Sequence, residues 1–246
     1  MNEHDSVGLI DFHTHILPCM DDGSRSADES VRMLRESTAQ NVDTIVLTPH
    51  FYAAKDNPSH FLQKREKTLS QLRERWQEPL PRLIPAAEVA YFEGITQMQE
   101  LLSMRMGTSR GLLIEMPQQK WTNRVVNDIL DLNSRSEYRV IIAHIERYAQ
   151  YQDDAVLNKL VHGGVLMQAN AEFFCSFFTA SKAKRLLTRG HIHLLGSDCH
   201  NMTSRPPVLR AAVERIRKSC GQTSVLRMIE LGRSLLAETD EVNAAR

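Results

Sequence analysis

Histidine and carboxylate side chains recur along the chain in positions where they could bind divalent metal ions. The first two form a His-x-His sequence, and the others are spread over most of the remaining chain. Imidazole and carboxylate ligands without thiolates favour manganese, iron or zinc over calcium or a cysteine-type zinc site. The predicted ligands are His13, His15, Asp22, His50, Glu88, Glu115, His144, Asp198 and His200.

Taken alone, each of these residues has an ordinary structural explanation. A lone histidine usually lies at the surface or in a hydrogen-bonded core, and a lone acid after a strand commonly caps a helix. Their shared position argues otherwise, because each candidate falls at the carboxyl end of a predicted strand. Charges crowded there cannot all be buried unpaired, because burying each unpaired charge costs several kcal/mol. Divalent cations would offset the repulsion between the carboxylates.

The charge of this group predicts what it could bind. Four carboxylates carry four negative charges, and the full set has too many ligands for one ion of four- to six-fold coordination. Three divalent cations would leave a net charge of about +2, which suits a phosphate dianion. A metal-bridging hydroxide would then be a nucleophile available near neutral pH. The residues therefore predict hydrolysis of a phosphate ester with three divalent ions, which could be Mn, Fe or Zn.

Short apolar runs that alternate with helical patterns predict the elements that position these side chains. Strands alternating with helices indicate a parallel sheet, and continuously apolar strands indicate burial on both faces. Seven such units in a chain of 246 residues suit an α/β barrel, whose active site lies at the carboxyl ends of the strands. We expect one domain over residues 1–246. The runs are Leu9–Phe12, Thr44–Thr48, Arg82–Ala87, Leu112–Ile114, Arg139–Ala143, Val165–Ala169 and His193–Gly196.

Two segments predict helix boundaries. Ser26-Ala-Asp-Glu29 is a capping-box sequence, in which the serine accepts from a free backbone N–H and the glutamate reaches back. The tail from Val208 to Leu236 predicts one or two helices. A second His-x-His sequence, His191 to His193, stands before or at the start of the seventh run, so we expect a structural or surface role for it, as for His4, His60 and His162.

Composition narrows the function classes. Thirty Lys and Arg balance thirty Asp and Glu, which argues against broad binding of nucleic acid or anionic membranes. No segment of about 20 apolar residues predicts membrane insertion, and the first residues lack the pattern of a signal peptide. The four cysteines are widely scattered, so we expect a reduced, cytoplasmic protein.

Several motifs together resemble the PHP (polymerase and histidinol phosphatase) superfamily, and within it the bacterial capsule-type, manganese-dependent protein-tyrosine phosphatases. The similarity runs from about Leu9 to Pro207. The motifs are Asp11-x-His13-x-His15-Ile-Leu-Pro, Asp21-Asp-Gly23, Thr48-Pro-His50, Leu-Ile-Glu115-Met-Pro117, His144-x-Glu-Arg-Tyr148 and Ser197-Asp-x-His-Asn201 followed by Arg205-Pro-Pro207.

The resemblance implies a distorted barrel of seven strands, the PHP fold, with a trinuclear centre. It implies that His13, His15, Glu88 and Asp198 hold one ion, that Glu88 bridges to a second held by Glu115 and His144, and that Asp22, His50 and His200 hold the third. Arg147 and Arg205 would clamp the phosphoryl oxygens, since a guanidinium donates two parallel hydrogen bonds. The implied substrate is phosphotyrosine on a protein, a capsule or exopolysaccharide tyrosine kinase.

Other functions remain open at this point. A phosphatase of a small phosphomonoester such as histidinol phosphate would share the metal ligands and differ in its loops. Within the segment Glu172–Ser181, the phenylalanines could form an apolar lip that grips an aromatic leaving group, or they could be buried core. An amidohydrolase also opens with His-x-His, but it usually carries a carboxylated lysine where this chain has Glu115. A non-catalytic binding protein is disfavoured because every ligand position is occupied.

Two cysteines depart from the family pattern beside the metal motifs. Cys199 is expected to pack away from the site as a small apolar residue, because its neighbours in the motif point inward. Cys19, if exposed near the cluster, could be sensitive to oxidation. Neither Cys175 nor Cys220 is followed by arginine at the spacing of cysteine-dependent tyrosine phosphatases, so a thiol-phosphate intermediate is not expected.

Overall fold

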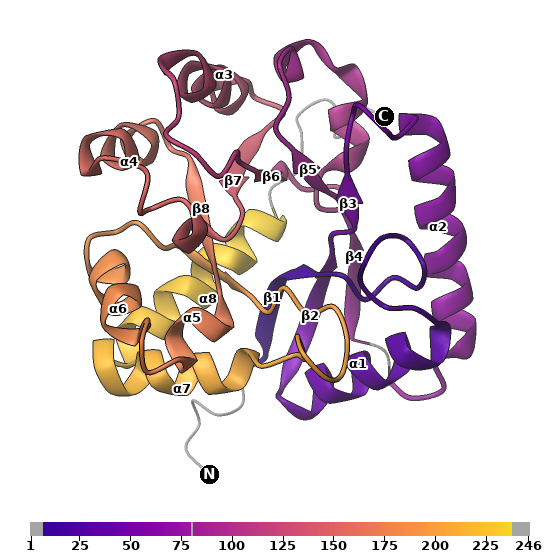
Figure 1. The fold of residues 1–246 in the computed structure, drawn as a ribbon. Helices are drawn as coiled ribbons and strands as arrows, with labels where there is room; N and C mark the ends of the chain where they lie inside the picture. The colour runs from indigo at the N-terminus through magenta and orange to yellow at the C-terminus, as the bar shows by residue number, and fades with distance from the viewer. Residues whose placement is uncertain (1–6, 80, 238–246) are drawn as a thin grey trace.

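The computed structural model describes residues 7–79 and 81–237, so His4 lies outside the described part. All of its strand pairs are parallel, and the strands curl into a half-barrel with helices on the outside (Figure 1). One sheet has the order β1-β2-β4, and the other has the order β3-β5-β6-β7-β8-β9. The strands are β1 (Leu9–Thr14), β2 (Val42–Leu47), β3 (His50–Phe51), β4 (Arg82–Pro85), β5 (Glu88–Ala90), β6 (Gly111–Glu115), β7 (Arg139–Ile142), β8 (Leu166–Asn170) and β9 (Leu194–Gly196).

All seven apolar runs form strands, and two of them are followed at once by a second, short strand. The second run lies at β2, and β3 begins after Pro49; the third run lies at β4, which ends at Pro85, and β5 begins at Glu88, just after the run. Proline lacks the N–H that a ladder requires, so a division at these prolines has a direct cause. As a consequence His50 and Glu88 begin short strands, whereas Glu88 had been expected to end one.

Helices or 3₁₀ turns follow most of the strands, as the alternation predicts, except that β3 follows β2 and β5 follows β4 directly. Helix α1 begins at the predicted cap, where the Ser26 side chain accepts from the Glu29 N–H and the Glu29 carboxylate accepts from the Arg25 N–H. The C-terminal tail forms two helices. The helices are α1 (Ala27–Ala39), α2 (Pro58–Arg75), α3 (Asn123–Ser134), α4 (Asp154–His162), α5 (Ala171–Cys175), α6 (Ala180–Thr188), α7 (Leu209–Cys220) and α8 (Gln222–Ala237), with 3₁₀ turns at Ile95–Gln97, Gln99–Met104 and Ile145–Arg147.

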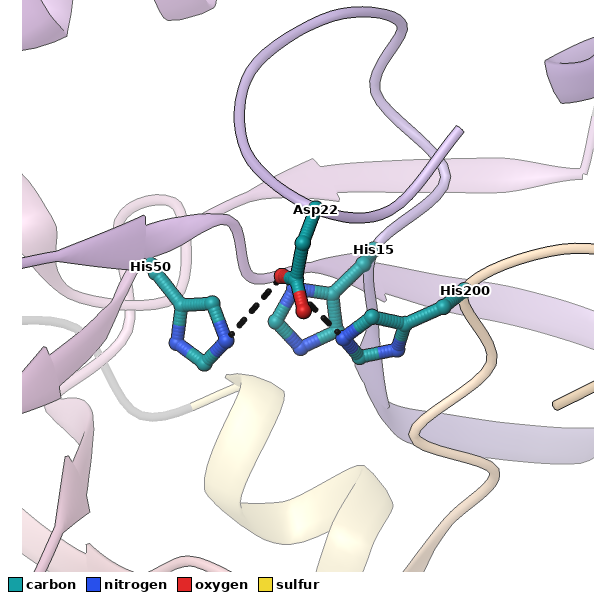
Figure 2. A group of neighbouring side chains, drawn as sticks. All are labelled: His15, Asp22, His50 and His200. Atoms are coloured by element: carbon teal, nitrogen blue, oxygen red, sulfur yellow. Dashed lines mark ion pairs between the residues drawn. The ribbon is translucent and has the colours of Figure 1, made fainter. Parts of the chain in front are cut away.

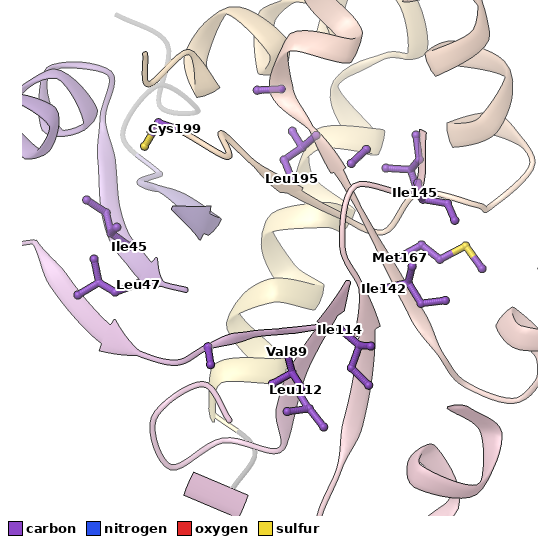
Figure 3. Close-up of a cluster of buried hydrophobic side chains, with 14 of the residues drawn as sticks. Ile45, Leu47, Val89, Leu112, Ile114, Ile142, Ile145, Met167, Leu195 and Cys199 are labelled. Atoms are coloured by element: carbon purple, nitrogen blue, oxygen red, sulfur yellow. The ribbon is translucent and has the colours of Figure 1, made fainter. Parts of the chain in front are cut away.

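Two apolar clusters hold the strands in place. The inner cluster joins residues of strands on opposite parts of the curl, among them Phe12, Val46 and Ile141, to Leu235 and Leu236 of α8. Side chains from strands so far apart can contact one another only inside the half-barrel. Because Leu235 and Leu236 belong to the same cluster, α8 covers the interior of the half-barrel. The outer cluster lies between strands and helices and includes Cys199, which is fully buried there as expected (Figure 3).

Backbone hydrogen bonds join the last strand to the first. The Asp198 N–H donates to the His13 carbonyl at 2.8 Å, and the His15 N–H donates to the Cys199 carbonyl at 2.9 Å. These bonds bring the segment after β9 beside the end of β1. Within residues 7–79 and 81–237, no helix has the length and apolar character needed to cross a membrane.

Candidate metal centre

A local irregularity in β1 directs the first histidines. The pairing of β1 with β2 slips between Asp11 and Thr14, and such bulges re-aim a side chain. Phe12 joins the inner cluster, while the next residue, His13, faces the carboxylates of the candidate site. The alternation of side chains along a strand places these adjacent residues on opposite faces, and the slip lies at this same point of the strand.

Four buried side chains converge on one point. His13 Nε2 lies 3.1 Å from Glu88 Oε2 and 3.5 Å from Asp198 Oδ1. His15 Nε2 lies 3.4 Å and 3.3 Å from the same two oxygens, and 3.1 Å from His13 Nε2. Two imidazole nitrogens and two carboxylate oxygens thus share a small space, as the ligands of one cation would.

Glu88 also belongs to a neighbouring group. Its other oxygen, Oε1, lies 2.8 Å from His144 Nε2, which lies 3.7 Å from Glu115 Oε1. His50 Nδ1 lies 2.9 Å from Glu88 Oε2, and His50, Glu88 and Glu115 place ligand atoms within 4.8 Å of one another. The Glu88 carboxylate therefore stands at the centre of the cluster and faces both sides.

Figure 2 shows a third group, in which Asp22 faces His50 and His200. Asp22 Oδ1 lies 3.5 Å from His50 Nε2 and 3.5 Å from His200 Nε2. His15 joins these three residues, with all four ligand atoms within 4.8 Å. Asp22 reaches the histidines from a loop, and its side chain is 67% exposed. All nine predicted residues therefore come together, with His15 contacting two of the groups.

The donor atoms fit a cation better than they fit one another. His50 Nδ1, Glu88 Oε2 and His200 Nε2 are buried and have no hydrogen-bond partner among the described residues. Leaving a buried polar atom unpaired costs about 1–3 kcal/mol. Close ligand atoms that lack hydrogen bonds are expected where an ion supplies the missing interaction.

The electrostatics of the cluster point the same way. Burial alone would raise the pKa of Glu88, yet it lies well below its usual value because of His13 and other histidines. Burial opposes protonation of His13 and His15, but the carboxylates raise the pKa of both. Burial, and then the adjacent Glu88, raise the pKa of Glu115. The carboxylates therefore require nearby positive charge, which protons on histidine or bound cations can provide.

Two acids that were not predicted as site residues support the histidines. Asp21 Oδ2 lies 2.7 Å from His15 Nδ1 and accepts from the His50 N–H at 2.8 Å. Asp11 is fully buried, and its Oδ1 accepts from the Ser197 N–H at 2.8 Å. Because Asp21 contacts His15 Nδ1, the other nitrogen, Nε2, faces the cluster. The hydrogen bond from Ser197 to Asp11 joins β1 to the segment after β9.

Gln168 and Asn170 on β8 provide a second set of supporting contacts. Gln168 Oε1 accepts from the His144 N–H at 2.8 Å and lies 3.2 Å from His13 Nδ1. Its Nε2 donates to Asn170 Oδ1 at 3.1 Å, and Asn170 Nδ2 donates to Asp198 Oδ2 at 2.8 Å. These bonds link three of the predicted ligands across one strand.

Both predicted arginines lie at the edge of the cluster. Arg147 and Arg205 donate to Asp198 Oδ2 at 2.7 Å and 2.6 Å. They line a cavity of about 630 Å³. His144 and Asp198, which flank this edge, have φ values of 29° and 53°, a left-handed conformation that is unusual outside glycine and concentrates at functional sites.

The second His-x-His sequence lies outside the three ligand groups. His191 Nε2 lies 2.8 Å from Asn158 Oδ1, and His193 Nδ1 accepts from the Met167 N–H at 3.1 Å. Burial, and then His191, lower the pKa of His193 to about 4. These contacts confirm the structural role predicted for the pair.

Known proteins resemble this chain over most of its length. A family model for capsular polysaccharide synthesis, CpsB/CapC, matches residues 9–232. The tyrosine-protein phosphatase CpsB of Streptococcus pneumoniae is 31% identical over 229 residues, which are 87% of this chain and 91% of that protein. The tyrosine-protein phosphatase YwqE of Bacillus subtilis is 28% identical over 223 residues, 87% of this chain and 85% of that protein.

A solved structure supports the same relationship. It comes from a study of YwqE of Bacillus subtilis and CpsB of Streptococcus pneumoniae, described as metal-dependent tyrosine phosphatases, and superimposes with a TM-score of 0.81 at 25% identity, covering 94% of this chain and 95% of that one. The resemblance predicted from the motifs is confirmed, and the histidinol phosphate alternative is not favoured. The chain belongs to the CpsB/CapC family of capsular polysaccharide synthesis.

Proposed function

We propose that this protein is a metal-dependent protein-tyrosine phosphatase. The observation that carries the proposal is the convergence of nine histidine and carboxylate side chains around Glu88, beside two arginines. The named relatives are tyrosine phosphatases, and the family is one of capsule synthesis. The proposed protein substrate is the tyrosine kinase of a capsule or exopolysaccharide system.

We assign three divalent ions to the cluster, with Mn²⁺ favoured and Fe or Zn as alternatives. Support comes from the contacts of Glu88, whose two oxygens face different ligand groups. The proposed ligand sets are His13, His15, Glu88 and Asp198 for one ion, Glu88, Glu115 and His144 for the second, and Asp22, His50 and His200 for the third. His15 and His50 each contact two groups, so a ligand could be shared where the sets meet.

We also infer that residues 1–246 form one PHP-type domain with seven barrel positions. The inference counts β2 with β3 as one position and β4 with β5 as another, since only two residues separate the members of each pair. The five other strands then take one position each. With this count, Glu88 again lies in the carboxyl-terminal part of its barrel position, where barrel enzymes carry their active-site residues.

The chain's own residues have defined tasks in the proposed reaction. Bound divalent ions would neutralise the phosphate and lower the pKa of water. Arg147 and Arg205 are placed to bind phosphoryl oxygens, because each guanidinium keeps N–H groups beyond the one donated to Asp198. Asn170 and the arginines fix the Asp198 carboxylate. The cavity beside them offers space for the aromatic ring of the leaving group.

Turnover of three substrates in the presence of Mn²⁺ tests this proposal: a phosphotyrosyl peptide, the same peptide with phosphoserine, and histidinol phosphate. We expect the phosphotyrosyl peptide to have the highest kcat/KM. His13→Ala and Glu88→Ala should abolish turnover of all three, whereas His60→Ala, on the exposed start of α2, should retain it. A preference for histidinol phosphate would contradict tyrosine phosphatase activity and leave the metal assignment standing.

Metal analysis of the purified protein tests the ion count separately. We expect about three equivalents of bound divalent metal per chain after loading with Mn²⁺, and loss of one equivalent in His200→Ala. A saturated content of one equivalent would contradict the trinuclear assignment.

A further inference from the structure

Two neighbouring phenylalanines lie almost completely in solvent. Phe177 and Phe178 are 92% and 93% exposed, while the other exposed large apolar side chains among the described residues, Leu102 and Tyr151, reach only 41% each. The two rings contact one another edge to face, with centroids 5.8 Å apart. Exposed apolar surface of this kind commonly marks a binding site.

Backbone hydrogen bonds hold the two rings out in solvent. The turn that carries them joins α5 to α6, and the Thr179 and Ala180 N–H groups both donate to the Ser176 carbonyl. The Thr179 hydroxyl donates to the Phe173 carbonyl at 2.7 Å. Phe173 is buried, so this hydrogen bond connects the turn to a residue of the core. A fixed turn presents the pair with little ordering left to occur on binding, which favours recognition.

The turn is continuous with the proposed catalytic cavity. Ser176 and Thr179, which flank the phenylalanine pair on both sides, line the same cavity of about 630 Å³ as Arg147 and Arg205. A chain whose phosphate reaches the arginines can therefore leave the cavity beside the phenylalanines.

The charge next to the pair suits a phosphorylated chain. Helix α6 follows the turn directly, and its exposed Lys184 and Arg185 take part in no ion pair recorded for residues 7–79 and 81–237. Unpaired cations attract an anionic ligand from a distance. An apolar tip beside positive charge could also contact an anionic membrane, but the position of the flanking Ser176 and Thr179 in the cavity of the arginines favours a substrate.

We propose that Phe177 and Phe178 form a docking site for an apolar side chain that flanks the phosphotyrosine of a protein substrate. This inference rests on the proposed phosphatase function and adds to it a specificity-determining pair outside the reacting centre. The phenyl rings would cover the flanking side chain while the arginines hold the phosphate. Burial of apolar surface on both partners supplies the binding free energy.

Steady-state kinetics with paired substrates test the docking site. The substrates are a phosphotyrosyl peptide with leucine residues flanking the phosphotyrosine, the same peptide with serine there, and p-nitrophenyl phosphate. In the parent protein we expect the leucine peptide to have the lower KM. In Phe177→Ser/Phe178→Ser, the ratio of kcat/KM for the leucine peptide to that for p-nitrophenyl phosphate should fall about tenfold, equivalent to about 1.4 kcal/mol. The fall should appear in KM, and the serine peptide should be little affected.

Leu102→Ser serves as the matched control, because it removes an exposed apolar side chain from the 3₁₀ turn Gln99–Met104. It should keep the parent ratio. An unchanged ratio in the double variant would overturn the docking site. It would also be overturned if sedimentation showed that the parent protein self-associates and the double variant does not. A third contrary result would be binding to phosphatidylserine vesicles that depends on the phenylalanines, with no difference between the variants in peptide kinetics. Absence of turnover on every phosphotyrosyl substrate would instead overturn the proposed function itself.

Discussion

Gln168 is expected to position metal ligands, and its replacement by leucine separates that role from a purely structural one. Its Oε1 accepts from the buried His144 N–H at 2.8 Å and lies 3.2 Å from His13 Nδ1. When Nδ1–H donates to this oxygen, the His13 Nε2 lone pair faces Glu88. Gln168→Leu removes the acceptor, so the imidazole loses the contact that selects its tautomer.

Two magnitudes follow from these contacts. The unpaired His144 N–H should lower the free energy of unfolding by about 1–3 kcal/mol. Loss of a residue that hydrogen-bonds to a metal ligand typically weakens metal binding by about 10–100-fold. We therefore expect Gln168→Leu to lower stability in urea denaturation with EDTA present, and to shift the Mn²⁺ concentration for half-maximal phosphatase activity upward by about 10-fold or more.

Gln152→Leu is the matched control for this variant. Gln152 is also buried, and its Oε1 accepts from the Trp121 N–H at 3.1 Å, away from the ligand groups. We expect a similar loss of stability in Gln152→Leu and no change in the Mn²⁺ requirement. If both variants lose stability equally and both keep the parent Mn²⁺ requirement, Gln168 has no positioning role and the reasoning is refuted.

Close packing, titration and cation binding can each be tested as well. Gly196→Ala would place a Cβ atom 2.5 Å from the His13 Cβ and 2.9 Å from its backbone nitrogen, so we expect a loss of about 1–3 kcal/mol in urea denaturation; Gly111→Ala, whose nearest neighbour is a flexible methionine side chain, should lose less. His193 has a pKa of about 4 in the fold against 6.5 in the unfolded chain, so its neutral form contributes stability above pH 6.5, and up to about 3 kcal/mol is lost as the pH falls to 4. In His193→Asn, whose side-chain oxygen can still accept from the Met167 N–H, that part of the pH dependence should disappear; an identical pH profile would contradict the assignment. Chelation by EDTA should lower the Tm, since cation binding to the folded state alone contributes about 4 kcal/mol at a thousand-fold excess over Kd, and an unchanged Tm with metal loss verified would oppose cation binding.

The strands could be predicted from apolar runs because a parallel sheet covered on both faces requires continuous burial. The short strands β3 and β5 could not be predicted from hydrophobicity, since the apolar runs end at Thr48 and Ala87, before these strands begin. Pro49 and Pro85 were the available signal, because a residue without an N–H interrupts a ladder. Pairing resumes directly after each proline, where the Glu88 N–H donates to the Pro49 carbonyl at 3.0 Å.

The convergence of the candidate ligands could be predicted because the carboxyl ends of parallel strands meet at one edge. The residues that support them were missed. Asp11 and Asp21 stand inside the recognised motifs but were assigned no role there, and Gln168 belongs to no motif with a recognisable spacing. Asp11 stands two residues before His13, and Gln168 stands two residues before Asn170; this two-residue alternation on a strand was the signal that could have identified them. Which of Asp21 and Asp22 faces the cluster depends on the loop conformation, and hydropathy contains no information on that.

Asp198 shows why the arginines and the candidate ligands must form one unit. Its Oδ1 lies within 3.5 Å of His13 and His15, while its Oδ2 accepts from Arg147 and Arg205. The Asp198 carboxylate thus lies between the guanidinium groups and the centre where cations would bind, and it holds both arginines before any phosphate arrives. Arg147 also reaches that centre directly, with its Nη1 3.2 Å from His144 Nε2. Fixed donors stabilise developing charge without reorganising during the reaction. Asp198 has a φ of 53°, so the fold maintains an unusual backbone conformation at a residue that contacts both halves of the site.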